Sequence, residues 1–116
     1  DGEKLKITYA NSRVEKYFTD FGAMRRKLPI EWVRTIKKHI DRLAAAESFG
    51  DFLKLGLGRP ERLTGGKNIR YSLKVTGNVR LIVEPNAKQD TVMICSEIEI
   101  EGVSDYHGGK ENWYIS

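Results

Sequence analysis

The sequence has one cysteine and two histidines among its 116 residues. A single cysteine, Cys95, can form neither an internal disulfide nor a cysteine-rich zinc site, and this cysteine usage is typical of a cytoplasmic protein. The two histidines, His39 and His107, are too few for a multi-histidine metal centre. We therefore expect neither a metal nor another cofactor. No apolar run approaches the ~20 residues that a membrane helix needs, so we expect no membrane partner.

Several common catalytic signatures are also missing. The sequence contains no phosphate-binding glycine-rich loop with its lysine and hydroxyl, no nucleophile elbow, no zinc-binding helix and no paired-cysteine motif. These absences exclude most metal and acyl-transfer chemistries. The composition, with 40% hydrophobic and 31% charged residues, is typical of a globular chain. Its length predicts one domain over residues 1–116. Residues 1–3 lack the layout of a signal peptide and are expected to include an expression remnant.

The net charge of +4 is unevenly distributed. Residues 54–80 contain seven basic side chains and one acidic one, Glu61, whereas residues 91–116 contain one basic and five acidic side chains. The basic residues are Lys54, Arg59, Arg62, Lys67, Arg70, Lys74 and Arg80. Such a local excess favours phosphate-bearing partners. A solvated polar surface is the open alternative.

Hydrophobic periodicity predicts a strand followed by two helices. Residues 4–9 alternate with period two, which is typical of a half-buried strand. Ser12 and Glu15 have the spacing of a capping box, and apolar residues then recur at helical spacing as far as Met24. Pro29 ends this helix and suits the first turn of the next, which Gly50 closes. We expect a turn or a single helical turn over residues 49–58.

The second half of the chain reads as strands. Residues 70–75 and 79–84 alternate on either side of Thr76-Gly77-Asn78 and predict a hairpin. A three-residue loop would pair apolar residues with each other, namely Val75 with Val79, Leu73 with Leu81 and Tyr71 with Val83. A turn at residues 85–90 and a strand at residues 91–100 are expected next. Pairing Glu84 with Thr91 would set Leu81 against Ile94 and Arg80 against Cys95.

These elements predict an α+β fold, in which two N-terminal helices pack on one face of a mainly antiparallel sheet. The other face would present Arg70, Ser72, Lys74 and Arg80 to solvent. Two groups stand out as candidate chemistry. Arg80 is a charged residue within an apolar strand, and Asp105-Tyr106-His107 places an acid, a phenol and an imidazole beyond the last long strand. An imidazole titrates near neutrality and can act as a general acid or base.

Four segments resemble the RelE/HigB superfamily of bacterial toxins from toxin–antitoxin systems, and its HigB-like "killer protein" branch in particular. The shared pattern is a progression of Leu-x-Gly, Tyr-Ser-x-x-Val, x-Arg-x-x-Phe and Asp-Tyr-His. The matching segments are Arg62-Leu63-Thr64-Gly65, Arg70-Tyr71-Ser72-Leu73-Lys74-Val75, Asn78-Val79-Arg80-Leu81-Ile82-Val83 and Asp105-Tyr106-His107. They span about 45 residues of this chain.

The resemblance implies a RelE/ParE-like fold and a cytoplasmic endoribonuclease. Such a hydrolase enters the ribosomal A site, cuts translated mRNA and so inhibits translation. A cognate antitoxin, expected to be a helix-turn-helix protein, holds it inactive. Arg80 aligns with the family's active-site arginine, and Asp105, Tyr106 and His107 align with its C-terminal catalytic trio.

Two features depart from the family pattern. Glu61 and Thr64 stand where some HigB-like toxins have an active-site histidine and lysine, and Arg62, Lys67 or Arg70 could substitute. Residues 108–116 extend beyond the Asp-Tyr-His motif at which such toxins often end. This tail would either cover the site or pack Trp113.

The chemistry of metal-free RNA cleavage suits these groups. Arg80 would stabilise the charge on pentavalent phosphorus. His107, oriented by Asp105, would be the acid/base group, and Tyr106 would contact the substrate. Arg62, Lys67, Arg70 and Lys74 are the predicted RNA-binding residues.

Two other functions remain open. A ParE-type toxin has the same architecture but inhibits DNA gyrase and cuts nothing; the Asp105-Tyr106-His107 trio argues against it. A non-catalytic RNA- or ribosome-binding module would use the basic residues for phosphate contacts alone. The acidic residues Glu97, Glu99 and Glu101 could receive a basic antitoxin segment or form a solvated strand face. We read Cys95 as a small buried hydrophobe and His39 as structural.

Overall fold

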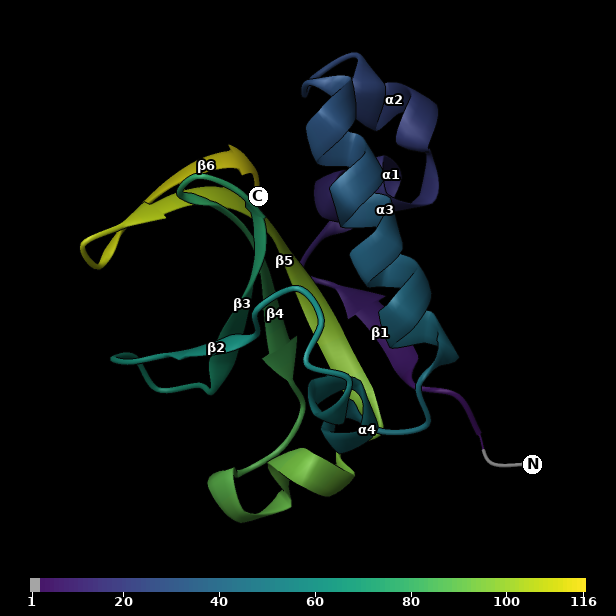
Figure 1. Ribbon diagram of the computed structural model, residues 1–116, viewed down its shortest axis with the longest axis vertical. Coiled ribbons are helices and arrows are strands. Elements are labelled where there is room, and N and C mark those ends of the chain that lie inside the picture. The colour runs from purple at the N-terminus through teal and green to yellow at the C-terminus, as the bar shows by residue number, and fades with distance from the viewer. Residues whose placement is uncertain (1–2) are drawn as a thin grey trace.

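The computed structural model describes residues 3–116, in which helices pack on one face of a strongly curved sheet (Figure 1). The helices are α1 (Ser12–Thr19), α2 (Phe21–Arg25), α3 (Ile30–Ala45), α4 (Phe49–Lys54) and the 3₁₀-helix η1 (Gln89–Ile94). The strands are β1 (Lys6–Tyr9), β2 (Glu61–Leu63), β3 (Arg70–Thr76), β4 (Val79–Pro85), β5 (Glu97–His107) and β6 (Lys110–Ile115). The predicted α+β class is confirmed.

Strand β5 is the centre of the sheet. The strand order is β1-β5-β4-β3-β2, and β6 also pairs with β5. One edge of β5 pairs with β4, while the other pairs with β1 at residues 97–100 and with β6 at residues 103–107. Only the β1–β5 pair is parallel among the described strands, so the expectation of a mainly antiparallel sheet is also confirmed.

The first predicted helix is in fact two helices. Asp20 interrupts it, and its Oδ1 accepts a hydrogen bond from Ala23 N, which caps the start of α2. The predicted cap at Ser12 is also wrong, because Asn11 occupies the cap position and accepts from Val14 N. Short polar side chains compete with the helical backbone for its free N–H groups, so each can start a new helix.

Helix α3 ends before the predicted stop at Gly50. It finishes at Ala45, and Gly50 lies inside the short helix α4, within the segment where one helical turn is expected. Gly50 serves a packing purpose instead. A Cβ atom at this position would lie 2.2 Å from the carbonyl oxygen of Met93, so the absence of a side chain lets α4 and η1 approach each other.

The predicted hairpin register is right in its body and wrong at its turn. Tyr71 pairs with Val83 and Leu73 with Leu81, as expected. Val79, however, pairs with Thr76, so the loop is the two-residue Gly77-Asn78 and a bulge falls between Lys74 and Thr76. The bulge absorbs the extra residue that a three-residue loop would have held, because two residues of a bulged strand oppose one partner residue.

The strand predicted at residues 91–100 is wrong in its first part and right over residues 97–100. Its first part forms η1, in which Ile94 is 76% exposed, and β5 begins only at Glu97. Glu84 therefore pairs with Glu99, and Arg80 with Ser104 rather than Cys95. Leu81 likewise pairs with Val103 rather than facing Ile94. An alternation of apolar residues fits more than one register, and the longer β5 gives β4 a partner along its whole length.

The main core lies between the helices and one face of the sheet. Its fully buried side chains come from both layers and include Met24, Ile36, Leu43, Phe49, Leu73, Leu81, Ile98 and Ile100. Cys95 is buried among them, as expected. His39 is also buried, and its Nε2 lies 2.7 Å from the carbonyl oxygen of Lys74, which fits a structural role. Within residues 3–116, no helix combines the length and the apolar character that crossing a membrane requires.

Replacing Gly102 with alanine should destabilise the fold strongly. Gly102 has φ +145°, and a Cβ atom there would lie 2.0 Å from the carbonyl oxygen of Ile115 on β6. We expect a loss of about 1–3 kcal/mol from backbone strain, plus the cost of displacing β6. Gly66→Ala is the matched control, because Gly66 also has a positive φ but faces open space. Denaturant unfolding of both variants checks the difference, and equal losses would contradict the close approach.

Candidate functional site

The face of the sheet opposite the helices carries most of the candidate residues; we call it the open face. The strand register confirms that Arg70, Ser72, Lys74 and Arg80 share it. In the row through Arg80, Lys74 lies on one side and Ser104 on the other, and Trp113 follows beyond Ser104 on β6. The expectation that all four predicted residues face solvent is wrong for Ser72, which is only 1% exposed. Curvature of the sheet explains this burial, because Arg70 on β3 reaches Glu111 on β6 across two intervening strands.

Two predicted catalytic residues, Arg80 and His107, each contact the turn between β3 and β4. Arg80 Nη1 donates to the carbonyl oxygens of Gly77, at 2.6 Å, and Val79, at 3.0 Å. His107 Nδ1 lies 2.8 Å from Nδ2 of Asn78, the next residue of the same turn. The Gly77-Asn78 turn thus contacts both the guanidinium and the imidazole, although Arg80 and His107 are far apart in sequence.

Asn78 is the functional partner that the sequence reasoning missed. An amide nitrogen only donates, so in this arrangement His107 Nδ1 accepts and the neutral ring carries its proton on Nε2. Among the described residues, no hydrogen bond joins Asp105 to His107. The hairpin register could have pointed to Asn78, because a two-residue loop places that residue at the tip nearest the end of β5.

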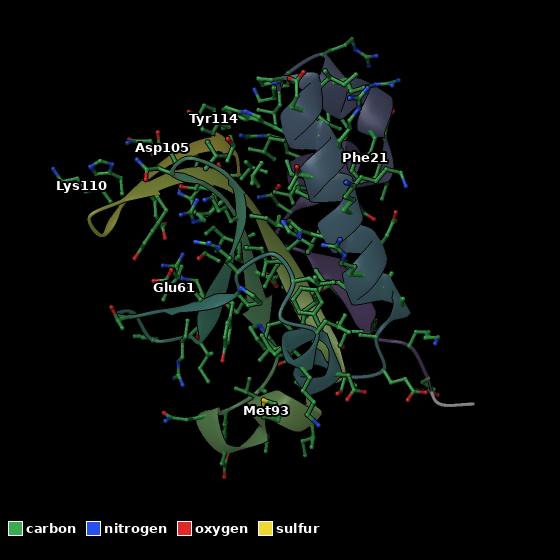
Figure 2. All side chains as sticks on the ribbon, viewed as in Figure 1. Phe21, Glu61, Met93, Asp105, Lys110 and Tyr114 are labelled. Carbon is green, nitrogen blue, oxygen red and sulfur yellow. The ribbon has the colours of Figure 1, made fainter. Side chains whose placement is uncertain are left out.

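The Asp105-Tyr106-His107 trio is not a loop but the end of β5. Asp105 pairs with Val79 and Asn112, Tyr106 with Glu111, and His107 with Lys110. Successive side chains of a strand point to opposite faces, so Tyr106 shares the open face with Ser104, while Asp105 and His107 do not. Figure 2 shows Asp105 and Lys110 near the β5–β6 hairpin, away from Glu61 on β2.

The predicted RNA-binding residues do not form one cluster. Lys74 is exposed and lies beside Arg80. Arg62 is exposed on β2, but it pairs with Tyr71 and so belongs to the opposite face from Arg70. Lys67 is exposed in the β2–β3 loop. Arg70 makes an ion pair with Glu111 of 2.7 Å, with side chains 26% and 19% exposed.

The C-terminal tail is a strand rather than a loose extension. Residues 110–115 form β6, which pairs with β5 beside the open face. Trp113 is 37% exposed on that face, whereas the ring of Tyr114 meets Trp32 of α3 edge-on, with centroids 5.2 Å apart. The tail therefore flanks the candidate site and also ties β6 to the helices.

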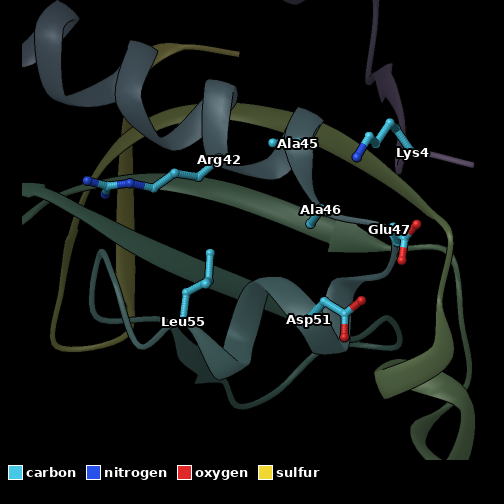
Figure 3. A pocket seen from close by; sticks show the side chains of 7 residues that line it. All are labelled: Lys4, Arg42, Ala45, Ala46, Glu47, Asp51 and Leu55. Atoms are coloured by element: carbon cyan, nitrogen blue, oxygen red, sulfur yellow. The ribbon is translucent and has the colours of Figure 1, made fainter. Parts of the chain in front are cut away.

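Away from the open face, a hollow lies between the end of α3 and helix α4 (Figure 3). It has a volume of about 450 Å³, and its lining is mainly apolar, with Arg42 near one end and the carboxylates of Glu47 and Asp51 near the other. None of the residues that the sequence predicts for chemistry lines it. We therefore place the candidate site on the open face.

The other end of the open face is acidic. Burial, together with the neighbouring carboxylates of Glu99 and Glu84, raises the pKa of Glu101 to about 8, although the charge of Arg70 opposes this rise. Glu101 is the extra residue of a bulge, since Ile82 pairs with Gly102 and Val83 with Ile100. At neutral pH this carboxyl is therefore mostly protonated.

Comparisons of the chain with protein-family models, with curated proteins and with solved structures gave no match. Within residues 3–116 there is no group of three or more histidine, cysteine or acidic side chains placed to hold a metal ion.

Glu101→Gln should remove a pH-dependent loss of stability. The folded-state pKa of Glu101, about 8, lies above the ordinary value of 4.5, so the folded protein binds this proton more tightly than the unfolded chain does. Stability from this group is complete below pH 4.5 and declines as the pH rises to 8. Melting temperatures of the wild type and the variant should therefore agree near pH 4.5 and diverge by pH 8, with the variant higher. A wild type that gains on the variant between these values would contradict the assignment.

Proposed function

We propose that this chain is the toxin of a toxin–antitoxin pair, with a RelE/HigB-like fold and the activity of a ribosome-dependent, metal-independent mRNA endoribonuclease. Translating ribosomes would supply the substrate, and a cognate antitoxin would hold the protein inactive. One observation carries the proposal. A single turn, Gly77-Asn78, contacts both a guanidinium suited to phosphate and an imidazole suited to proton transfer.

His107 can serve as the acid/base group through Nε2. The Asn78 amide holds Nδ1 as the ring now stands, and rotation of that amide by half a turn would present its oxygen to a protonated Nδ1. Nε2 is therefore able to act either as donor or as acceptor. In the proposed reaction it takes the proton from the 2′-hydroxyl, whose oxygen attacks phosphorus. The imidazolium then returns this proton to the 5′ oxygen as its bond to phosphorus breaks, and a 2′,3′-cyclic phosphate remains.

Arg80 suits the charge that develops on phosphorus. Its Nη1 is held by two backbone carbonyls, and no hydrogen bond within residues 3–116 engages Nε or Nη2. A guanidinium fixed in this way can present its remaining N–H groups to phosphate oxygens without further ordering. Lys74, exposed beside it, adds a second positive charge.

The sparse machinery fits dependence on the ribosome. The site offers one imidazole, one fixed guanidinium and a phenol, and the proposal assigns no metal to activate the nucleophile. A flexible RNA would rarely adopt the in-line geometry that attack of the 2′ oxygen requires, so alignment by the ribosome would supply part of the rate. We expect little cleavage of free RNA.

A non-catalytic RNA-binding role is the second candidate, because exposed Lys74 beside Arg80 would bind phosphates whether or not cleavage follows. Such a protein would arrest or retard translation without producing new 5′ ends in mRNA. A gyrase-inhibiting toxin of the ParE type would instead cause DNA damage and leave mRNA intact.

Loss of His107 should reduce mRNA cleavage by about 10²- to 10⁴-fold, the usual contribution of one general acid or base. Arg80→Ala should also abolish most cleavage, and Arg80→Lys should restore little because an ammonium lacks the planar fork. The measurement is the mapping of new 5′ ends in cellular mRNA after induction. Lys38→Ala, on the exposed side of α3, is the control and should cut normally. Wild-type cleavage by both His107→Ala and Arg80→Ala would disprove the assignment.

A further inference from the structure

Trp113 is a partly exposed aromatic residue of the open face that the proposed cleavage step does not use. It is 37% exposed, and it lines a hollow of about 520 Å³ between the β2–β3 loop and the β5–β6 hairpin (Figure 1). Along the row of paired residues, Trp113 follows Ser104, which in turn follows Arg80. Trp113 is therefore two strands from Arg80, or roughly 10 Å. The hollow thus adjoins the position proposed for the cleaved phosphate.

Tyr106 gives this hollow a second aromatic wall. It pairs with Glu111, which is two residues from Trp113 on β6, so the two aromatic residues are diagonal neighbours on one face. Diagonal neighbours of this kind lie about 7–8 Å apart. Within residues 3–116, neither Tyr106 nor Trp113 packs on another aromatic ring. The parts of both rings that line the hollow are therefore available to a flat ligand.

The other walls of the hollow bring neither bulk nor a free charge. Gly65 and Gly66 line it from the β2–β3 loop, and a Cβ atom at either glycine would meet no other atom within 4 Å. Arg70 and Glu111 form an ion pair of 2.7 Å, in which the buried Glu111 Oε1 is held against the guanidinium. The two charges offset each other, so the aromatic rings have the larger part in deciding what the hollow can bind.

We propose that Trp113 stacks on an unpaired base of single-stranded RNA, and that strand β6 thereby positions the RNA for cleavage. The inference rests on the proposed ribonuclease function, in which it gives residues 110–115 a role. Aromatic rings stack on every base, since every base has a π-face, so this site holds a base without selecting one. Phosphate contacts at Lys74 and Arg80 and a base on Trp113 would together fix the RNA at its backbone and at one base.

A purely structural Trp113 would only cover Ser104, its buried neighbour on β5. Loss of the indole ring would then change the stability of the fold, and no particular base of the RNA would depend on it. The two roles therefore predict different results when the ring and the base are removed separately and together.

The test measures the affinity for a short single-stranded RNA whose 2′-O-methyl groups prevent cleavage. Trp113→Leu keeps an apolar side chain but removes the ring, and it should weaken binding about 5- to 150-fold. Trp113→Tyr should restore most of the affinity, because a phenol ring also stacks. Tyr114→Leu is the matched control, since Tyr114 is the next residue of β6 and is 38% exposed, but its ring packs on Trp32. This control should lower the melting temperature and leave RNA affinity unchanged.

A second arm of the test removes the base instead of the ring. Abasic substitution of one nucleotide at a time should identify a position at which the wild type loses affinity by a similar factor. Trp113→Leu should lose almost nothing further at that position, because the contact is already absent. Trp32→Phe leaves Trp113 as the one tryptophan, since the sequence has two. In that background the intact RNA should quench the fluorescence more strongly than the RNA with that abasic position.

The outcomes separate this inference from the proposed function. Equal affinities of the wild type and Trp113→Leu, or abasic losses that are the same in both proteins, would overturn the stacking site. Cleavage of cellular mRNA by Trp113→Leu at the wild-type rate would also overturn it, while leaving the ribonuclease proposal intact. Coupled losses at one nucleotide, in a protein that produces no new 5′ ends, would support the stacking site and overturn the ribonuclease proposal.

Discussion

Strand β5 is hydrogen-bonded along both of its edges, and this pairing positions β1, β4 and β6. One edge of β5 carries β4, and the other carries β1 and then β6. The change from β1 to β6 occurs at Glu101 and Gly102, where β5 bulges and the end of β6 comes within reach of the Gly102 backbone. A bulge bends and twists its strand. This bend accompanies the curvature that lets Arg70 on β3 contact Glu111 on β6.

That curvature divides the open face into three parts. Arg80 and Lys74 lie near the β3–β4 turn, the hollow lined by Glu111 and Trp113 lies beside them, and the carboxyl groups around Glu101 lie at the other end. The positive charges that would meet phosphate are thus separated along the strands from the negative ones. Arg70 stands between, where it pairs with Glu111 and lowers the pKa of Glu101. This arrangement explains how a chain of modest net charge can favour an anionic partner at one place.

The spacing of apolar residues predicts those helices and strands that are determined by residues close together in the sequence. The apolar stripe of residues 32–43 predicts α3, and the alternation on either side of Gly77-Asn78 predicts the hairpin with Tyr71 opposite Val83. The register of β5 was not predictable in this way, because Val92 and Ile94 continue the same alternation as Ile98 and Ile100. Asn11 and Asp20 bind backbone N–H groups, and they thereby set helix limits that hydrophobic spacing cannot define.

The candidate site is likewise only partly predictable from the sequence. Arg80 and His107 are visible in the sequence, whereas Asn78 as the partner of His107 and Glu111 as the partner of Arg70 depend on β5 pairing with β4 and β6.

We infer that the Gly77-Asn78 turn and the end of β5 form one RNA-binding site. The most direct measurement is amide chemical-shift mapping of the labelled protein during titration with a short RNA whose 2′-O-methyl groups prevent cleavage. The largest changes should occur at residues 76–80 and 104–113, where β4, β5 and β6 meet. Changes concentrated on α1 and α3, or spread evenly over all exposed lysines and arginines, would contradict it.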